Sequence, residues 1–551
     1  MNRFDYRKYS PITPIQKDDR RWPSRTIEKA PKWCSVDLRD GNQALIEPMS
    51  PEQKLEVFIL LVDLGFKEIE VGFPSASQPD FDFVRKLIEE DLIPDDVTIQ
   101  VLTQAREELI SRTYESLKDA RKAIVHVYNS TSVVQREQVF GKSKEEIKHI
   151  AVQGATWVKE YAQRYPQTQW QFQYSPESFT GTEIEYAVEV CNAVNAVWQP
   201  TLERPTIINL PATVEMTTPN VYADQIEWFC DHINNRDSVI VSLHTHNDRG
   251  CGVAAAELGI MAGADRVEGT LLGNGERTGN MDIVTAAMNL YSRGVDPELD
   301  LANIDRIIQT IESCTQLKVH PRHPYVGELV FAAFSGSHQD AINKCLVKYE
   351  EGAIWEVAYL PIDPRDVGRS YQEVIRINSQ SGKGGVAYIL AQEYGLQLPR
   401  WMQVDFSPYV QQQAEKTEKE LSAESINTLF KETYLDVAGA YVIDSFHMAY
   451  RNDTEQLSAT LKKGDSAIDI VAQGNGPIEM FVRALSDKLE YSIAVVSYTE
   501  HTLGDSENSE AIAYIQANIN GQRYCGVGRS CDIVKASFQA LLNAVAKAEN
   551  A

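Results

Sequence analysis

The chain lacks the features that would assign it to membrane, secreted or nucleic-acid-binding proteins. No apolar run reaches the roughly eighteen residues that a membrane-spanning helix needs. The N-terminus, M-N-R-F-D-Y-R-K-Y-S-P, has no apolar segment, so no secretory signal is predicted. The net charge of −25 argues against nucleic acid or an anionic membrane as a partner.

Two common motif classes are also missing, paired cysteines and nucleotide-binding glycine loops. The eight cysteines include no C-x-x-C pair, so we expect free thiols in a reducing cytoplasm. No G-x-G-x-x-G follows the first predicted strand, which argues against an open dinucleotide-binding sheet. The string N-S-Q-S-G-K-G-G at 378–385 lacks the spacing of a Walker site.

What the sequence does contain is a regular alternation of strand and helix patterns that begins at Lys32. Short runs rich in β-branched residues alternate with amphipathic segments such as 52–65 and 107–120. Eight such units in one block predict an α/β fold, a (β/α)₈ TIM barrel. The predicted strands are 33–40, 68–73, 98–103, 123–128, 170–175, 205–210, 238–246 and 266–271, and the last barrel helix is expected from about Met281 to Gly294.

The barrel is expected to be one of four parts of the chain. We expect residues 1–30 to form an extended N-terminal arm and residues 31–310 to form the catalytic barrel. Residues 311–430 are expected to form helical linker subdomains. Residues 431–551 predict a C-terminal α+β domain of two βββα units, with glycine turns at 474–476 and 526–528 before the two helices. We expect this repeat to bind a ligand or to dimerise.

Two histidines one residue apart end the seventh predicted strand. Successive side chains of a strand alternate between its faces, so His244 and His246 project side by side. Asp40, at the end of the first strand, completes a set of two histidines and one carboxylate, and Asn280 offers a further oxygen. Such a site suits Mg²⁺, Mn²⁺ or Zn²⁺ with positions left open for substrate and water. The alternative is a pair of core histidines bonded to backbone carbonyls.

Other polar residues also end predicted strands, where barrel enzymes carry their chemistry. Arg39 beside the metal ligand suits a ketone oxygen or a carboxylate, although it could instead pair with Glu70 inside the barrel. Glu177 follows the fifth strand and could equally be a rim carboxylate in an ion pair. The remaining strand-end residues of this set are Ser175, Asn209 and Thr213.

Four motifs on these strand ends resemble those of the α-isopropylmalate synthases. They are L-R-D-G-N-Q-A-L, E-V-G-F-P-S-A-S, H-T-H-N-D-R-G and G-N-G-E-R-T-G-N. This family belongs to a superfamily of metal-dependent, Claisen-condensing enzymes that also includes homocitrate and citramalate synthases and 3-hydroxy-3-methylglutaryl-CoA lyase. The resemblance runs from about residue 5 to the end and is closest to the longer bacterial type.

The resemblance implies that acetyl-CoA condenses with 3-methyl-2-oxobutanoate and water to give (2S)-2-isopropylmalate and CoA, the first committed step of leucine biosynthesis. A divalent metal polarises the ketone, Arg39 stabilises the alkoxide, and K⁺ is a further activator. His338 and Tyr371 serve proton removal or thioester hydrolysis, reaching in this family into the partner subunit's site of a homodimer. Glu177, counted with the catalytic residues, and Thr213 hold the oxoacid. Its isopropyl group lies among Leu102, His126, Ser175 and Asn209, although His126 could equally be a core histidine.

The resemblance also implies that leucine binds the C-terminal domain and inhibits the barrel. The residues expected around leucine are Gly474, Gly476, Ile478, Gly526, Gly528, Ile533 and Ala536. A citramalate or homocitrate synthase is the alternative within the superfamily. The C-terminal repeat argues against a lyase. The intact set of Asp40, His244, His246 and Arg39 argues against an amino-acid sensor without catalytic activity.

Overall fold

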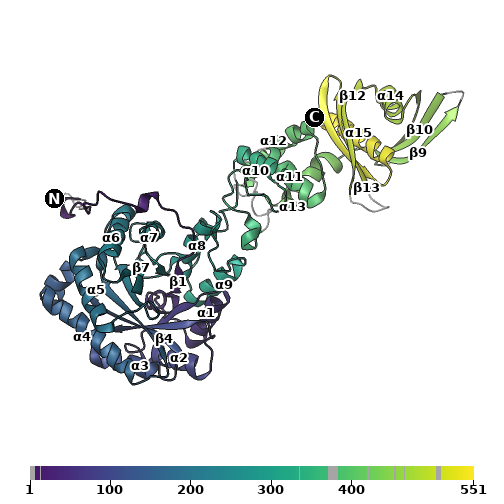
Figure 1. The fold of residues 1–551 in the computed structure, drawn as a ribbon. Helices are drawn as coiled ribbons and strands as arrows, with labels where there is room; N and C mark the ends of the chain where they lie inside the picture. Colours follow the sequence, from purple (N-terminus) through teal and green to yellow (C-terminus); the bar gives the residue numbers. More distant parts are fainter. Residues whose placement is uncertain are drawn as a thin grey trace. The chain divides into compact units, whose positions relative to one another are not determined.

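The computed structural model describes residues 6–12, 14–333, 335–369, 383–417, 421–451, 454–464, 466–503 and 510–551. The chain divides into two compact units (Figure 1). The first comprises Met1–Val330 with Asp366–Gly368, and the second comprises Phe331–Arg365 with Arg369–Ala551. Within the described residues, no helix has both the length and the apolar character needed to cross a membrane.

The first unit is built on a closed barrel of eight parallel strands, which confirms the predicted fold class. The barrel closes where β8 pairs with β1, with Lys32 opposite Arg266 and Ser35 opposite Gly269. The strands are β1 Lys32–Ser35, β2 Glu68–Gly72, β3 Thr98–Gln104, β4 Lys122–Ser130, β5 Gln169–Glu177, β6 Thr206–Ala212, β7 Val239–Thr245 and β8 Arg266–Gly269.

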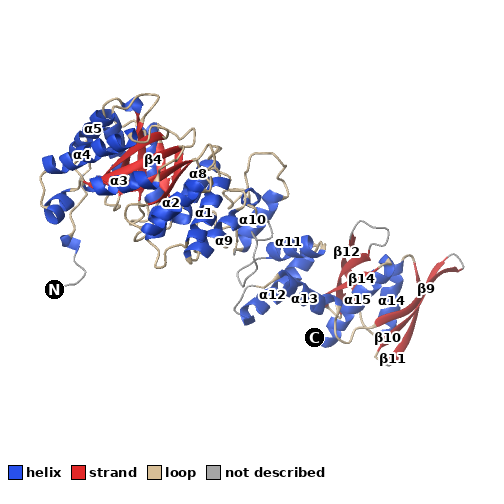
Figure 2. Ribbon diagram, turned by 90° about the horizontal axis from the view of Figure 1, so that it is seen from below, coloured by secondary structure: helices blue, strands red, loops and turns tan. Residues whose placement is uncertain are grey.

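Helices follow each strand and surround the barrel, as Figure 2 shows for α1 to α5. Two of them begin with capping boxes, in which Ser50 and Ser143 accept hydrogen bonds from backbone N–H groups of the first turn. The barrel helices are α1 Pro51–Asp63, α2 Gln78–Glu89, α3 Glu107–Ser116, α4 Lys144–Gln163, α5 Ile184–Trp198, α6 Pro219–His232, α7 Gly252–Met261 and α8 Ile283–Tyr291, and α9 Ile304–Thr315 follows them.

The first strand is shorter than predicted, and this changes the setting of Asp40. Strand β1 ends at Ser35, and residues Asp37–Gly41 form one turn of π-helix. The Asp37 carboxylate accepts hydrogen bonds from the backbone N–H of Leu271 and from the Ser35 hydroxyl, which fixes the turn. Arg39 and Asp40 therefore lie on a helical turn above the barrel. Strand β8 likewise ends at Gly269 rather than residue 271.

The N-terminal arm is anchored to α6 rather than free. Arg20 binds Asp224 through both Nε and Nη2, at 2.7 and 2.8 Å. The indole N–H of Trp22 donates to the same carboxylate, and its backbone N–H donates to Glu227. These bonds use buried carboxylates on one face of α6, so the arm covers that helix.

The second unit contains linker helices and then two βββα units, as predicted (Figure 2). The linker helices are α10 Gly336–Leu346, α11 Lys383–Tyr394, α12 Arg400–Thr417 and α13 Ala423–Phe430. The first repeat is β9 Val442–Arg451, β10 Thr454–Lys463, β11 Ser466–Gly474 and α14 Pro477–Leu489. The second repeat is β12 Ile493–Leu503, β13 Glu510–Ile519, β14 Gln522–Ser530 and α15 Ile533–Asn550.

The sheet of the second repeat is covered on both faces. Alternate residues of β13 contribute to two different hydrophobic cores. Ala513 and Ile515 pack in the core with α14 and α15, whereas Ile512 and Tyr514 pack with α11, α12 and α13. The linker helices and the second repeat therefore share one core.

Candidate metal and substrate site

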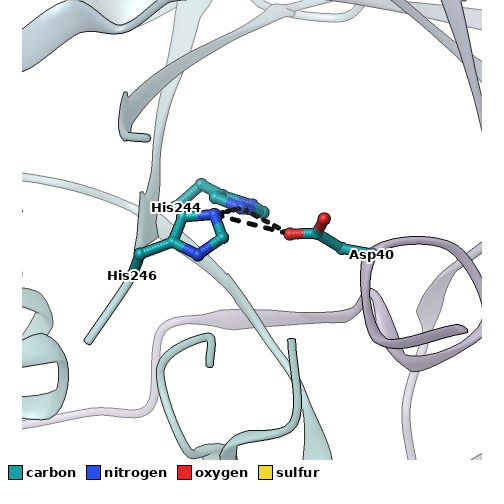
Figure 3. Close-up of side chains that lie close together, drawn as sticks. All are labelled: Asp40, His244 and His246. Carbon is teal, nitrogen blue, oxygen red and sulfur yellow. Dashed lines mark hydrogen bonds and ion pairs between the residues drawn. The ribbon is translucent and has the colours of Figure 1, made fainter. Parts of the chain in front are cut away.

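His244 lies near the end of β7 and His246 just beyond it, where the backbone of His246 pairs with that of Asn280. The two imidazoles and the carboxylate of Asp40 are buried and converge (Figure 3). Nε2 of His244 lies 3.1 Å from Oδ2 of Asp40 and 3.3 Å from Nε2 of His246. Nε2 of His246 is 3.6 Å from the same oxygen. The end of β7 and the turn at Asp37–Gly41 thus bring the predicted histidines together with the predicted carboxylate.

The charges of this cluster depend on its burial. Burial opposes ionisation of Asp40, but Arg39 and His244 hold the pKa of that carboxyl well below its usual range. Burial would lower the pKa of His244, yet hydrogen bonds to Asp40 and Glu268 outweigh it and raise the pKa to about 9. Burial and the neighbouring His244 lower the pKa of His246 to about 4. The cluster therefore couples an ionised carboxylate to two imidazoles whose pKa values are shifted in opposite directions.

These residues fit a divalent metal ion. Two imidazole nitrogens and a carboxylate oxygen within reach of one another are a donor set that Zn²⁺, Mn²⁺ and Mg²⁺ sites share. Asn280 donates from Nδ2 to the carbonyl of Asn274, which leaves Oδ1 available. That oxygen is buried and has no hydrogen-bond partner among the described residues. A buried acceptor without a donor is costly unless a ligand satisfies it.

The cluster opens into a cavity of about 280 Å³ at the C-terminal end of the barrel strands. The cavity brings together most of the residues that the sequence singled out. These are Arg39, Asp40, Leu102, His126, Ser175, Glu177, Asn209, Thr213, His244 and His246.

Six residues of the cavity wall were not predicted. The strand period offers a signal for two of them, because Tyr128 and Pro211 lie two residues after His126 and Asn209 on the same strand face. The others come from segments beyond strand ends, which have no periodicity but belong to three of the four motifs quoted above. They are Gln43, Phe73, Glu276 and Arg277.

Arg39 combines the two roles considered for it. Its Nε contacts Glu70 in the barrel interior, and its Nη1 lies 2.9 Å from Oδ1 of Asp40. Only about 10% of its side chain is exposed, and that part faces the cavity. The guanidinium is thus held beside the candidate metal ligands while it still lines the cavity.

The polar residues of the inner wall hydrogen-bond to one another. His126 contacts Glu70 through Nδ1 at 2.8 Å and Ser175 through Nε2 at 2.7 Å. Asn209 donates from Nδ2 to the Ser175 hydroxyl at 3.1 Å. His126 is therefore a satisfied core histidine and a cavity residue at the same time. Because these bonds are made within the wall, the wall has few donors left for a polar substrate side chain.

The outer wall carries groups that could orient a carboxylate. Thr213 accepts a hydrogen bond from the backbone N–H of Ser178, so its hydroxyl proton remains available. Arg277 donates to the carbonyl of Thr213 and to the carboxylate of Asp248, which ties three loops together. Glu177 accepts a hydrogen bond from the Ser130 hydroxyl.

The two site residues predicted beyond the barrel, His338 and Tyr371, do not line this cavity in the part of the chain that the structure describes. His338 lies on α10 of the second unit and is exposed. Its ring stacks on that of Tyr359, with centroids 3.9 Å apart. Tyr371 lies outside the described residues.

In the C-terminal domain, the prediction of a glycine turn at 526–528 is wrong. Gly526 and Gly528 lie within β14, and α15 packs closely over them. A Cβ atom on Gly528 would come within 2.0 Å of the Ala536 carbonyl oxygen, and one on Gly526 within 2.1 Å of the Ala540 oxygen. These glycines are needed for packing, because their lack of a side chain lets the helix approach the strand.

The two helix N-termini of the repeats also differ. Asp532 caps α15 by accepting hydrogen bonds from the N–H groups of Val534 and Lys535, at 2.8 and 3.1 Å. Helix α14 follows Gly476, which supplies no side-chain cap. Of the other residues expected around leucine, Gly474 ends β11, Ile478 is in the first turn of α14, and Ile533 and Ala536 are in α15.

Fold and site together define a (β/α)₈-barrel protein with a buried two-histidine, one-aspartate cluster and a C-terminal repeat of two βββα units. The HMGL-like family matches residues 30–311. The family described as alpha-isopropylmalate synthase, post-catalytic domain-like, matches 328–391, and the LeuA allosteric (dimerisation) domain matches 420–549.

The relatives that match over nearly the whole chain are named 2-isopropylmalate synthase. A 2-isopropylmalate synthase of Alcanivorax borkumensis is 56% identical over 99% of this chain and 98% of its own length. One of Clostridium acetobutylicum is 52% identical over 98% of this chain and 99% of its own length. A hydroxymethylglutaryl-CoA lyase structure from Pseudomonas aeruginosa is 17% identical, covering 53% of this chain and 95% of that one, with a TM-score of 0.43. The chain belongs to the 2-isopropylmalate synthase family, and the resemblance inferred from its motifs is confirmed.

Proposed function

We propose that the chain condenses acetyl-CoA with 3-methyl-2-oxobutanoate and water to give (2S)-2-isopropylmalate and CoA. The observation that carries the proposal is the convergence of Asp40, His244 and His246 at the floor of the cavity that Arg39 also lines. A 2-oxoacid can chelate a metal through its ketone and carboxylate oxygens. An arginine beside that metal supplies a second positive group for the same oxygen.

Several residues of the chain would together activate the ketone of the oxoacid. Asp40, His244, His246 and Asn280 would hold Mg²⁺, Mn²⁺ or Zn²⁺, which when bound polarises the ketone as a Lewis acid. Arg39 would donate to the ketone oxygen as negative charge develops there during carbon–carbon bond formation. Because Glu70 and Asp40 hold its guanidinium, Arg39 needs little reorganisation to do so.

The wall of the cavity would select the oxoacid. Leu102 supplies an apolar surface, and His126, Ser175 and the amide nitrogen of Asn209 are hydrogen-bonded within the wall. A branched aliphatic side chain fits such a surface better than a charged one, whose donors or acceptors would stay unpaired. Thr213 would donate to the oxoacid carboxylate, and Glu177 would complete the rim of the oxoacid pocket.

The acetyl group needs a base, and from the family resemblance we assign His338 and Tyr371 to this step or to the later hydrolysis of the thioester. The base removes a proton from the acetyl methyl group, whose carbon then attacks the ketone carbon. Water afterwards cleaves the thioester and releases CoA. A histidine suits proton transfer near neutral pH.

The test is release of free thiol from acetyl-CoA with pyruvate, 2-oxobutanoate, 3-methyl-2-oxobutanoate and 2-oxoglutarate. The branched oxoacid should give the highest kcat/KM. A preference for pyruvate would indicate a citramalate synthase, and one for 2-oxoglutarate a homocitrate synthase. Metal removal with a chelator should abolish thiol release, and Mg²⁺, Mn²⁺ or Zn²⁺ should restore it. Addition of K⁺ should raise the rate further.

We further propose that residues 431–551 bind leucine, and that the chain works in the cytoplasm as a homodimer. The match to the LeuA allosteric (dimerisation) domain supports both regulation and self-association. The eight cysteines are all free thiols, which suits a reducing compartment. Leucine should inhibit thiol release, and analytical ultracentrifugation should give twice the chain mass.

A further inference from the structure

Behind the metal ligands lies Glu268, a carboxylate that is fully buried on β8. Its Oε2 lies 2.9 Å from Nδ1 of His244. The same oxygen accepts a hydrogen bond from Nδ2 of Asn209 at 3.2 Å. One oxygen of Glu268 therefore contacts both a candidate metal ligand and a residue of the oxoacid pocket.

The other oxygen of Glu268 is held from inside the barrel. Oε1 accepts hydrogen bonds from Arg266 Nη1 and Gln173 Nε2, both at 2.7 Å, and from Gln100 Nε2 at 3.1 Å. Arg266 is itself fully buried, and it provides the counter-charge that keeps Glu268 ionised. With donors on both oxygens, the carboxylate is fixed in position and orientation.

A second metal site is the competing interpretation, because Glu70, His126 and Glu268 also lie within ligand distance of one another. Their bonds argue against it. The carboxylate of Glu268 already accepts five hydrogen bonds, and that of Glu70 accepts from Arg39 and Gln100. The guanidinium groups of Arg39 and Arg266 thus already supply the positive charge that a second metal ion would bring.

We infer that Glu268 is a positioning residue that orients His244 toward the divalent ion. Its carboxylate requires a proton on Nδ1 of His244, which leaves the lone pair of Nε2 facing Asp40. Second-layer carboxylates of this kind fix the tautomer and ring orientation of metal-binding histidines. The inference rests on the proposed function insofar as that function requires a metal at Asp40, His244 and His246.

The geometry also explains why a carboxylate is needed at position 268. Arg266 donates to one oxygen of Glu268 and His244 donates to the other, whereas a glutamine side chain has only one acceptor oxygen. Either His244 would lose its acceptor or Arg266 would be left partly unpaired. Glu268→Gln therefore changes the hydrogen bonding while it keeps the volume.

The test measures Mn²⁺ affinity directly, by the electron paramagnetic resonance signal of free Mn²⁺ in titrations of the full chain. Glu268→Gln should weaken Mn²⁺ binding by about 10- to 100-fold, and excess Mn²⁺ should restore much of the lost thiol release. Gln173→Met is the matched control, because it removes a donor from Oε1 and leaves the His244 bond intact. It should keep the wild-type Mn²⁺ affinity.

In Glu268→Gln the buried Arg266 keeps its ion pair with Glu68 but loses the one with residue 268. Because this loss could unfold the single variant, a second variant removes both charges. Glu268→Gln combined with Arg266→Met leaves no unpaired cation in the barrel and should show the same loss of Mn²⁺ affinity. Equal Mn²⁺ affinities of the wild type and either Glu268 variant would overturn the inference. Absence of Mn²⁺ binding by the wild type would instead contradict the proposed metal site itself.

Discussion

Nη1 of Arg39 lies 2.9 Å from Oδ1 of Asp40, while Nε of the same guanidinium contacts Glu70. A single side chain therefore joins the candidate metal ligand to the buried charges of the barrel. Lysine at this position has a similar charge but only one nitrogen, so it cannot span both carboxylates and a ketone oxygen.

Arg39→Lys should lower kcat for thiol release by about 10²- to 10³-fold, because a fixed donor to the developing negative charge is lost. Metal content, measured by mass spectrometry, should remain at the wild-type level. Arg20→Lys is the control, since it makes the same change in a bidentate pair with Asp224 outside the cavity. An Arg39→Lys enzyme with nearly full kcat would contradict the role of Arg39.

His246→Ala should abolish activity and lower the bound divalent metal, while circular dichroism and the melting temperature remain close to those of the wild type. The reason is that His246 supplies one of the three converging ligand atoms and has no hydrogen-bond partner at Nδ1 among the described residues. His232→Ala, which changes an exposed histidine of α6, serves as the control. A fully active, metal-free His246→Ala enzyme would contradict the assignment of His246 as a metal ligand.

The barrel and the histidine pair could be predicted because both depend on short-range periodicity. Alternation along β7 predicts which face His244 and His246 share, and eight βα units predict a closed sheet. The π-helical turn at Asp37–Gly41 could not be predicted, because bonds to the backbone of Leu271, more than 200 residues later, stabilise it. The sequence pattern continued the strand there instead.

The role of Glu268 was also beyond sequence reasoning. Its partners lie on four other strands, and only the closure and register of the barrel bring them together. The G-V-G motif shows the opposite problem. Glycine is compatible with a turn and with close packing, and only the neighbouring helix decides between them.

The stability of the barrel should depend on the protonation of Asp37. Burial raises the pKa of this carboxyl to about 7, against the hydrogen bonds from Leu271 and Ser35 that lower it. The folded state thus binds the proton more tightly than the unfolded state. The contribution of this proton to the free energy of unfolding is fully present below about pH 4. It is lost as the pH rises to about 7, at up to about 1.4 kcal/mol per pH unit.

Asp37→Asn has no proton to lose, so its melting temperature relative to the wild type should increase between pH 4 and pH 8. Differential scanning calorimetry across this range measures the difference. Asp237→Asn, an exposed carboxylate of the same unit, should show no such trend. A constant difference for Asp37→Asn would mean that the carboxyl titrates normally.

The proposed base can be tested through the homodimer. His338→Ala should lower kcat more than it raises the KM of the oxoacid, because it removes a proton acceptor and leaves the cavity of the barrel intact. If His338 serves the partner subunit's site, mixed dimers of His338→Ala and Asp40→Ala contain one complete site and should recover part of the activity. No recovery in heterodimers isolated with two affinity tags would exclude sharing between subunits.

A pair of glycine substitutions separates folding from leucine binding in the C-terminal domain. Gly528→Ala should destabilise the domain by at least about 1–3 kcal/mol, because the new methyl group would lie against the backbone of α15. The same change at Gly476 meets no atom within 4 Å and leaves the backbone unstrained. Gly476→Ala should therefore keep the melting temperature, and any change in leucine affinity would report on the N-terminus of α14. Calorimetric titration with leucine and thermal melts of both full-length variants measure the two effects.

A stable Gly528→Ala protein would contradict the close packing of β14 on α15, and unchanged leucine affinity in Gly476→Ala would remove Gly476 from the proposed site.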